Sequence, residues 1–369
     1  MRRARSLAHA IGVLAVAAVA TSASAQTSVT VYGVVDTGIE YVNRVGSAHD
    51  SVVRMPSATG TVPSRWGLRG SEDLGGGMKA NFQLEGGFGP ETGASLNGGR
   101  LFGRQAWVGL AGSWGQISVG RQYTMSLWAT ADPDVLGPNI YGTSNLDANL
   151  ANPRSDNSIA YRGKFGGLIL GGTYSFGRDT VNAGPSLSGQ NCAGENPSDH
   201  RACQQWTAMV MYEGSNWGVS AAYDSMRGGP GAFAGLTSSS MRDTRMIFAG
   251  YAILARAKMG AGVLRRDNEA SLATPRSDLW WAGVAYDITP GFTLGTQLSW
   301  LDYHHSDNRS ILFAVRGLYS FSKRTSAYAT AGYIDNGGTL TNSVSAGGPG
   351  STTPGGNQLG VMVGIKHIF

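Results

Sequence analysis

The sequence predicts an all-β fold, a sixteen-stranded antiparallel transmembrane β-barrel with short periplasmic turns and long external loops. Three observations predict it. Apolar and polar residues alternate along most of the chain, which is the pattern of strands with two different faces. Only 14% of the 369 residues are charged, against roughly 25% in typical soluble domains. Short and long connections between the alternating segments follow one another, as in an up-and-down barrel.

The first 25 residues have the pattern of a secretory signal peptide. A basic start precedes an apolar stretch from Leu7 to Ala20, and Ala23-Ser24-Ala25 is a small-residue cleavage site. The formal net charge of +5 includes three arginines of this segment, so the remaining chain is close to neutral and we expect no nucleic-acid partner. Residues 26–369 contain no Pro- or Ser-rich linker, which favours one continuous barrel domain.

The alternation is clear in residues 168–176, where Leu, Leu, Gly, Tyr and Phe occupy the even positions. Residues 292–300 likewise place Phe, Leu, Thr, Leu and Trp on one face. No uncharged apolar run after Ala25 approaches the ~20 residues that a membrane helix needs, so strands are the expected spanning elements. The predicted strands are 29–42, 64–74, 77–89, 101–113, 115–124, 155–166, 168–177, 204–216, 218–226, 241–254, 256–267, 277–288, 292–303, 309–322, 326–335 and 357–369.

The connections separate the two ends of the predicted barrel. Tight turns, such as the one at Leu74-Gly75-Gly76, are expected on the periplasmic side, and long loops outside. The long loops are 43–63, 90–100, 125–154, 178–203, 227–240, 268–276, 304–308 and 336–356.

A soluble β-sandwich is the alternative to a membrane barrel. Its strands are usually about 5–6 residues long, whereas the segments here are about 9–14 residues, which suits a tilted span of ~9–11. Aromatic residues also gather near segment ends, as expected at the two membrane interfaces. These residues are Tyr174, Phe176, Trp280, Trp281, Trp300, Tyr303, Tyr319 and Phe321.

Four stretches carry a resemblance to a known family: Val31–Asp36, Ser64–Gly75, Val119–Tyr123 and Gly364–Phe369. Through them the whole mature chain resembles a Gram-negative general diffusion porin of the trimeric, sixteen-stranded type. The resemblance implies a homotrimer in the outer membrane of a Gram-negative bacterium, in contact with membrane lipid and lipopolysaccharide. It also implies a water-filled channel for small hydrophilic solutes and ions. The terminal Phe369 resembles the signal by which such barrels are recognised for insertion.

The resemblance places the narrowest part of the channel at the third long loop, folded into the lumen. This loop carries three acids: Asp132, Asp134 and Asp147. The predicted wall cations are Arg65, Arg69, Arg104, Arg154 and Arg162. Of these, Arg65, Arg104 and Arg154 resemble the basic cluster that faces the acidic loop in the family, where the charges would set up a transverse field. Each arginine could instead line the lumen away from the gap, each acid could simply be solvated, and the ion preference stays open.

Arg121 shares its strand face with Ile117 and Val119, so we expect it to point away from the lumen. In a trimer it could meet an acid from the second loop of a neighbour, and Glu91 is the candidate partner. The alternative is an arginine that extends to the membrane interface.

The two cysteines, Cys192 and Cys203, lie eleven residues apart in a polar segment of an exported chain. This spacing predicts a disulfide that closes a surface loop. We expect no metal site, because His304 and His305 would point to opposite faces of a strand.

Three functions are compatible with these observations. The leading one is a non-specific passive porin, and the second is a channel of the same architecture with a preferred solute. The third is a barrel enzyme such as a lipase or a protease, which needs a nucleophile or metal constellation that the sequence lacks. We therefore expect neither enzymatic activity nor a cofactor.

Overall fold

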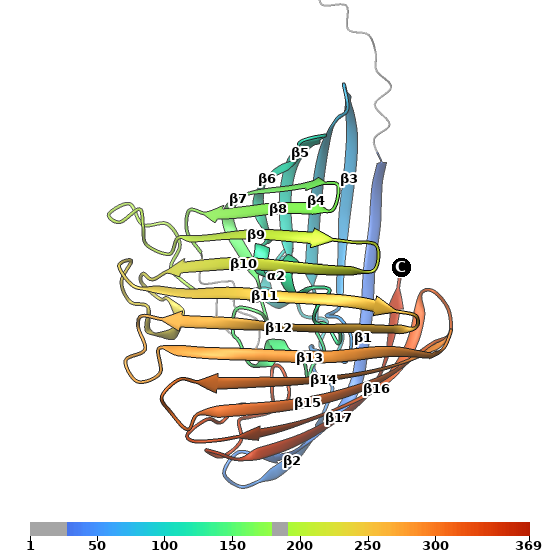
Figure 1. Cartoon of the computed structure of the whole chain (residues 1–369), viewed down its shortest axis with the longest axis vertical. Helices are drawn as coiled ribbons and strands as arrows, with labels where there is room; N and C mark the ends of the chain where they lie inside the picture. Colours follow the sequence, from blue (N-terminus) through green and yellow to red (C-terminus); the bar gives the residue numbers. More distant parts are fainter. Residues whose placement is uncertain (1–27, 179–190) are drawn as a thin grey trace, which may run out of the picture.

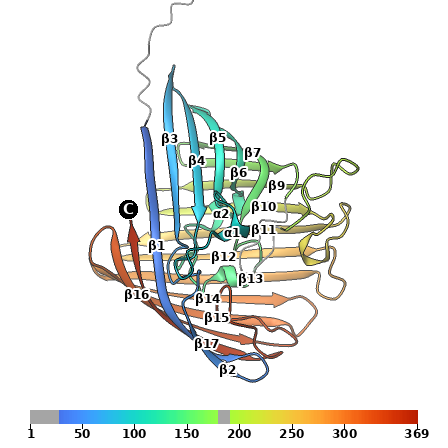
Figure 2. The ribbon, with the colours of Figure 1, turned by 180° about the vertical axis from the view of Figure 1, so that it is seen from behind.

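Seventeen antiparallel strands form one sheet over the residues that the structure describes, 28–178 and 191–369. In this computed structural model the sheet curves round until its first strand meets its last (Figure 1). β1 (Ser28–Val45) pairs with β17 (Asn357–Ile368) on one side and with β3 (Arg65–Gly75) on the other (Figure 2). The predicted signal peptide lies outside the described residues.

Sixteen strands make the closed wall, because the short β2 (Asp50–Arg54) only extends the loop end of β1. The predicted barrel is confirmed. The remaining strands are β4 (Met78–Gly87), β5 (Gln105–Gly112), β6 (Gly115–Tyr123), β7 (Arg154–Phe165), β8 (Leu168–Ser175), β9 (Gln205–Glu213), β10 (Trp217–Arg227), β11 (Arg242–Leu254), β12 (Ala257–Asn268), β13 (Arg276–Thr289), β14 (Phe292–Tyr303), β15 (Arg309–Ser320) and β16 (Thr325–Asn336).

The strand faces follow the predicted alternation. In β17, Val363 is 59% exposed on the outside, whereas its neighbour Met362 is 1% exposed on the inside. The seam closes through Phe369, whose backbone N–H donates to Gly33 and whose carbonyl accepts from the same residue, both at 3.1 Å. A closed barrel pairs its backbone groups without leaving an edge, as hydrocarbon requires.

Over residues 28–178 and 191–369, helical structure is confined to short segments. They are α1 (Leu96–Gly99), α2 (Met125–Thr130), η1 (Thr143–Asn145) and η3 (Phe233–Gly235). No helix within the described residues is long and apolar enough to cross a membrane.

The tight turns lie at one end of the wall, and the one between β3 and β4 shows what they demand of the chain. Gly75, Gly76 and Gly77 have φ of 78°, 62° and 80°, a left-handed conformation that favours glycine. The opposite end carries the long loops, among them the fourth, where the predicted disulfide joins Cys192 to Cys203.

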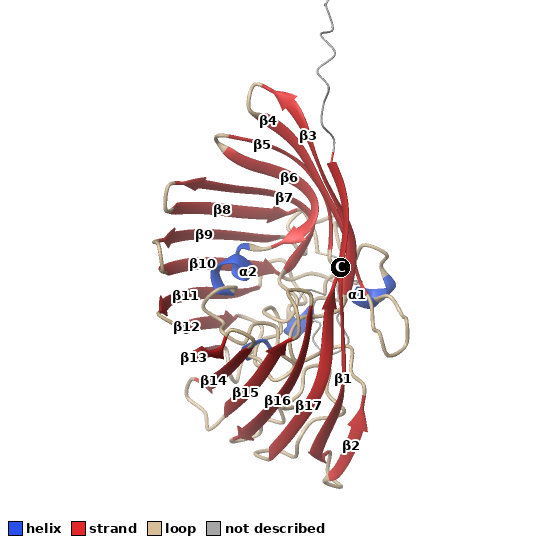
Figure 3. Cartoon of the chain, turned by 90° about the vertical axis from the view of Figure 1, so that its right-hand side faces the viewer, coloured by secondary structure: helices blue, strands red, loops and turns tan. Residues whose placement is uncertain are grey.

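The third loop, between β6 and β7, folds into the barrel as predicted, and Figure 3 shows its helix α2 within the curve of the strands. The first loop, between β1 and β3, enters the lumen as well, a position that the alternation of the strands does not predict. Asp36 of β1 holds this loop, because Thr61 and Ser64 of the loop both bond to it. Tyr328 of β16 bonds to Asp36 as well and accepts from the N–H of Gly60 at 3.3 Å.

The first, third and eighth loops meet inside the barrel. The N–H of Ile140 in the third loop donates to Thr59 of the first loop at 2.8 Å. The N–H of Ala346 in the eighth loop, between β16 and β17, donates to Ile140 at 2.9 Å. The side chain of Arg316 on β15 bonds the carbonyls of Gly60 and Leu136 at 3.0 and 2.9 Å. These contacts lie on the side of β15–β17, whereas the cavities that remain in the lumen are lined by β3–β7 and by the inward-folded loops.

Candidate pore constriction

Three predicted wall arginines line one cavity in the structure, and two of them bind a single carboxylate. Glu85 of β4 faces inward, and its Oε1 lies 2.6 Å from Nε of Arg104, just before β5. Its Oε2 lies 3.6 Å from Nε of Arg65 on β3. Arg154, the first residue of β7, completes the set, which we call the arginine cluster: Arg65, Arg104 and Arg154.

Tyr123, at the end of β6, joins the members of the arginine cluster. Its hydroxyl accepts a hydrogen bond from Nη2 of Arg104 at 2.9 Å. The guanidinium of Arg154 lies over its ring, 5.0 Å from the centroid. Arg154 also donates to Asn152, is only 5% exposed, and keeps an Nε without a partner among the described residues. Two of these three cations thus bind Glu85, while the third, Arg154, contacts Tyr123 and Asn152.

A cavity of about 420 Å³ separates the arginine cluster from the third loop. Its charged lining, within the described part of the chain, consists of the arginine cluster and Glu85, so the formal charge is three positive against one negative. The third loop faces the cavity with Leu127, Pro138, Leu150 and Ala151 among other neutral residues. The two sides of the gap therefore differ in polarity.

The three predicted loop acids lie elsewhere, which corrects the expectation that they face the arginines. Asp132 pairs with Nζ of Lys258 on β12 at 2.8 Å. Asp134 accepts from Nε2 of Gln297 on β14 at 2.7 Å. The third loop rests against this side of the barrel, where the half-exposed Asp132 and the less exposed Asp134 each have a partner on the wall.

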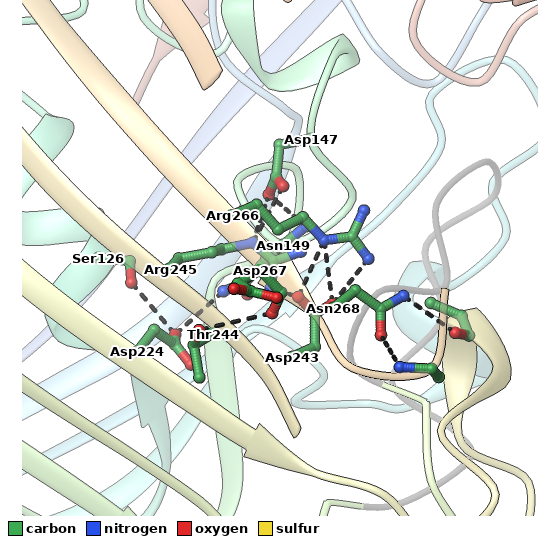
Figure 4. A network of polar contacts seen from close by, with 12 residues as sticks. Ser126, Asp147, Asn149, Asp224, Asp243, Thr244, Arg245, Arg266, Asp267 and Asn268 are labelled. Carbon is green, nitrogen blue, oxygen red and sulfur yellow. Dashed lines mark hydrogen bonds and ion pairs between the residues drawn. The ribbon is translucent and has the colours of Figure 1, made fainter. Parts of the chain in front are cut away.

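Asp147 makes the most buried of these contacts (Figure 4). Its Oδ2 lies 3.0 Å from Nε of Arg245 on β11, and the side chain of Arg245 is fully buried. Beside this pair, Arg266 of β12 binds Asp243 at 2.7 Å. Burial by itself would raise the pKa of Asp147, but the guanidinium of Arg245 brings this pKa below its usual value.

A second buried carboxylate in Figure 4, Asp224 of β10, holds both ends of the third loop. It accepts from Ser126 of α2 at 3.2 Å and from Nδ2 of Asn149 at 3.0 Å. The loop is thus fixed to β10–β14, and its neutral face is left toward the opening.

The other two predicted arginines line the lumen beyond the arginine cluster. Arg69 stacks over Tyr32 at 5.2 Å, and Arg162 stacks over Trp128 of α2 at 4.2 Å. Arg162 belongs to a second cavity of about 370 Å³, which shares Gln105 and Tyr123 with the first. The two cavities together mark the course of the opening between the wall and the third loop.

Arg121 pairs within its own chain, with Asp156 of β7, and its Nε donates to the carbonyl of Gly103 at 2.7 Å. Asp156 also binds Arg100 of the second loop at 2.8 Å. Glu91 accepts from the hydroxyl of Ser57 at 2.5 Å. The proposed contact of Arg121 with Glu91 of a neighbouring subunit stays a prediction.

The sequence of this barrel matches a known protein family. A family model described as Gram-negative porin matches residues 12–339. The chain belongs to the Gram-negative porin family. This porin is a protein of the Gram-negative outer membrane, and its family and fold are those of a channel rather than of an enzyme.

Two curated relatives of the porin illustrate its range of similarity. It is 39% identical over 182 residues to an outer membrane porin protein of Bordetella pertussis, a match that covers 44% of the chain and 46% of that protein. It is 29% identical over 370 residues to outer membrane porin protein 32 of Delftia acidovorans, covering 96% of the chain and 98% of that protein. The chain thus spans about half of the first relative and nearly all of the second.

Solved structures agree with the fold. The anion-selective porin from Comamonas acidovorans superposes with a TM-score of 0.77 at 23% identity, covering 93% of this chain and 100% of that one. OmpT of Vibrio cholerae superposes with a TM-score of 0.64 at 16% identity, covering 93% and 98%. At these identities the likeness concerns the architecture of the porin.

Proposed function

We propose that this porin is a homotrimeric diffusion channel that passes small hydrophilic solutes and ions down their gradients and favours anions. The observation that carries the ion preference is the charged lining of the 420 Å³ cavity, three arginines against one glutamate. No described aspartate of the third loop lines this cavity to offset it.

The physical argument rests on the narrowness of the gap. Two unit charges 4 Å apart interact by roughly 1 kcal/mol in water and by several kcal/mol near a protein surface. Low-dielectric walls on both sides concentrate the field of the arginine cluster, and this field attracts small anions and repels cations. Anions then enter the constriction more readily, while the open passage lets them leave.

The solved relatives support the two finer parts of the proposal. The structure from Comamonas acidovorans is that of an anion-selective porin, and one solved form of OmpT is a trimer. The large apolar side chains on the outside of the barrel suit contact with outer-membrane lipid, with lipopolysaccharide and with neighbouring subunits.

The reversal potential of the porin in a planar bilayer, under a KCl gradient, tests the ion preference. We expect the wild type to favour chloride, and the double variant Arg65→Ala plus Arg104→Ala to shift several-fold toward potassium. The matched control is Arg201→Ala plus Arg324→Ala, which removes the same charge from exposed positions outside the cavity. An equal shift in both double variants would contradict the proposal.

A further inference from the structure

The cavity beside the arginine cluster is amphipathic. One side presents guanidinium groups, with Arg104 and Arg154 both buried. The other side is the third loop, where Leu127 of α2 and Leu150 stand partly exposed at the cavity. Water in such a gap is bound well on one side and poorly on the other.

The contacts of the third loop explain why its side of the cavity is neutral. Asp132, Asp134 and Asp147 all bond to the opposite wall, through Lys258, Gln297 and Arg245. No carboxylate of the third loop therefore competes with a solute for the arginines, and the leucines are the natural partners for the rest of that solute.

We propose that this cavity is a binding site for small monocarboxylates with an apolar body, such as a saturated six-membered ring. This inference rests on the proposed function, because it names the solutes that an anion-favouring passage would take best. The carboxylate accepts hydrogen bonds from the arginine cluster, in the charge-assisted geometry that guanidinium groups favour. The ring lies against Leu127 and Leu150, where it displaces poorly held water.

Three further features fit this class of solute. Arg154 has no acid in direct contact among the described residues, only Asn152 and the ring of Tyr123, so its charge is not offset by a carboxylate of its own. The volume of about 420 Å³ falls in the range of small-molecule sites, ~300–1,000 Å³. The site also adjoins the second cavity, since Gln105 and Tyr123 line both, so it lies along the same side of the lumen.

A matched pair of solutes tests the proposal. Cyclohexanecarboxylate and quinate share a six-membered ring and one carboxylate, but quinate carries four hydroxyl groups on its ring. Each is added to the wild-type porin in a planar bilayer in KCl, and the concentration that halves the current is measured. We expect cyclohexanecarboxylate to block at a concentration about tenfold lower, since burial of a few CH₂ groups is worth a factor of this order.

Two variants locate the apolar contact. Each variant, Leu127→Asn or Leu150→Asn, removes apolar surface that the ring would contact. The blocking concentrations of cyclohexanecarboxylate and quinate should then differ by no more than about twofold. Leu150 also packs against the buried cluster of the barrel, so Leu127→Asn serves where Leu150→Asn fails to assemble. The control is Leu272→Asn, at a position 98% exposed in the sixth loop, which should keep the wild-type difference.

The outcomes separate the two proposals. Equal block by both solutes in a wild-type porin that still favours chloride overturns the amphipathic site and leaves the proposed function standing. A tenfold difference that survives in Leu127→Asn overturns the assignment of the site to this cavity. A wild-type porin that shows no preference for chloride overturns the proposed function.

Discussion

Asp147 of the third loop and Arg245 of β11 form an ion pair that is almost completely removed from solvent, with 3.0 Å between Oδ2 and Nε. Such a pair contributes little beyond the cost of its own desolvation, but it penalises any state in which one partner is buried alone. It therefore selects one position for the third loop, and with it the width of the opening.

Arg245→Met should accordingly destabilise the porin, because Asp147 is left as a buried carboxylate without its cation. The expected loss is about 3–5 kcal/mol, read as a lower unfolding temperature of the detergent-folded protein and as added noise in the single-channel current. The matched control is Lys164→Met, which breaks the more exposed ion pair of Lys164 with Glu213 and should cost at most about 1 kcal/mol. Equal losses in the two variants would argue against an anchoring role for Arg245.

Asp134 gives the third loop a dependence on pH. Burial is the main reason that its pKa is raised to about 6, against the hydrogen bond from Gln297 and the nearby charge of Arg316. The folded state then holds this proton more tightly than the unfolded state, whose aspartate titrates near ~3.9. The stabilising contribution is present below about pH 4 and is lost as the pH rises through 6.

Asp134→Asn should remove this dependence, because the amide keeps an acceptor for Gln297 and cannot ionise. From pH 4 to pH 7 the stability of the variant relative to the wild type should rise by roughly 2–3 kcal/mol in free energy of unfolding. This change is measured as a rising difference between their unfolding temperatures. Above pH 7 the difference should stay constant. A difference that does not change across this range would contradict the assigned burial of the ionised form.

The alternation of side chains along each strand explains how much of the fold could be predicted from the sequence. In β17, Val361 and Ile365 point out and Gln358 points in, as the alternation requires. The inward orientation of Glu85 could also be predicted, since Glu85 alternates with outward residues of β4. Its position between Arg65 and Arg104 could not. Register across sixteen strands then follows, because a slip of one residue would exchange the two faces.

The contacts of the loops could not be predicted in the same way. An aspartate in a loop has no periodicity, so nothing in the sequence directs Asp147 toward β11 instead of toward the arginine cluster. Asp156 shows that prediction from alternation also fails within a strand where the pairing is irregular. The left-handed Asn157, with φ of 47°, and the bulge between Gly120 and Gln122 shift the phase, and Asp156 turns to Arg121 rather than toward Arg154.

Glu85→Gln should raise the preference for anions, opposite in sign to the loss of the arginines. Glu85 is the carboxylate among the described residues that line the cavity, and it neutralises part of the arginine cluster. Removal of one unit charge at contact distance is worth about 1 kcal/mol in water, or about fivefold in local chloride concentration. The reversal potential in a KCl gradient measures it, with Glu213→Gln as the control outside the cavity. No change, or a shift toward potassium, would contradict the role of Glu85.

Tyr141 holds the third loop through an aromatic contact with two strands, and this contact gives a prediction about pore width. Its ring, 1% exposed, lies against Gly332 of β16 and Gly360 of β17. A methyl group added at Gly332 or at Gly360 would stand 2.5 or 2.6 Å from the nearest ring atom, which forces the ring to move. Overpacking of this kind costs about 1–3 kcal/mol.

Gly332→Ala should therefore push Tyr141 and the adjoining third loop toward the arginine cluster, and narrow the opening. We expect a smaller single-channel conductance, together with a modest fall in unfolding temperature. Gly172→Ala on β8 is the control, since a methyl group there would lie 3.5 Å from its nearest neighbour, an ordinary contact. If Gly332→Ala conducts as the wild type does, the position of the third loop is set by its aspartates alone, and the aromatic contact only fills space.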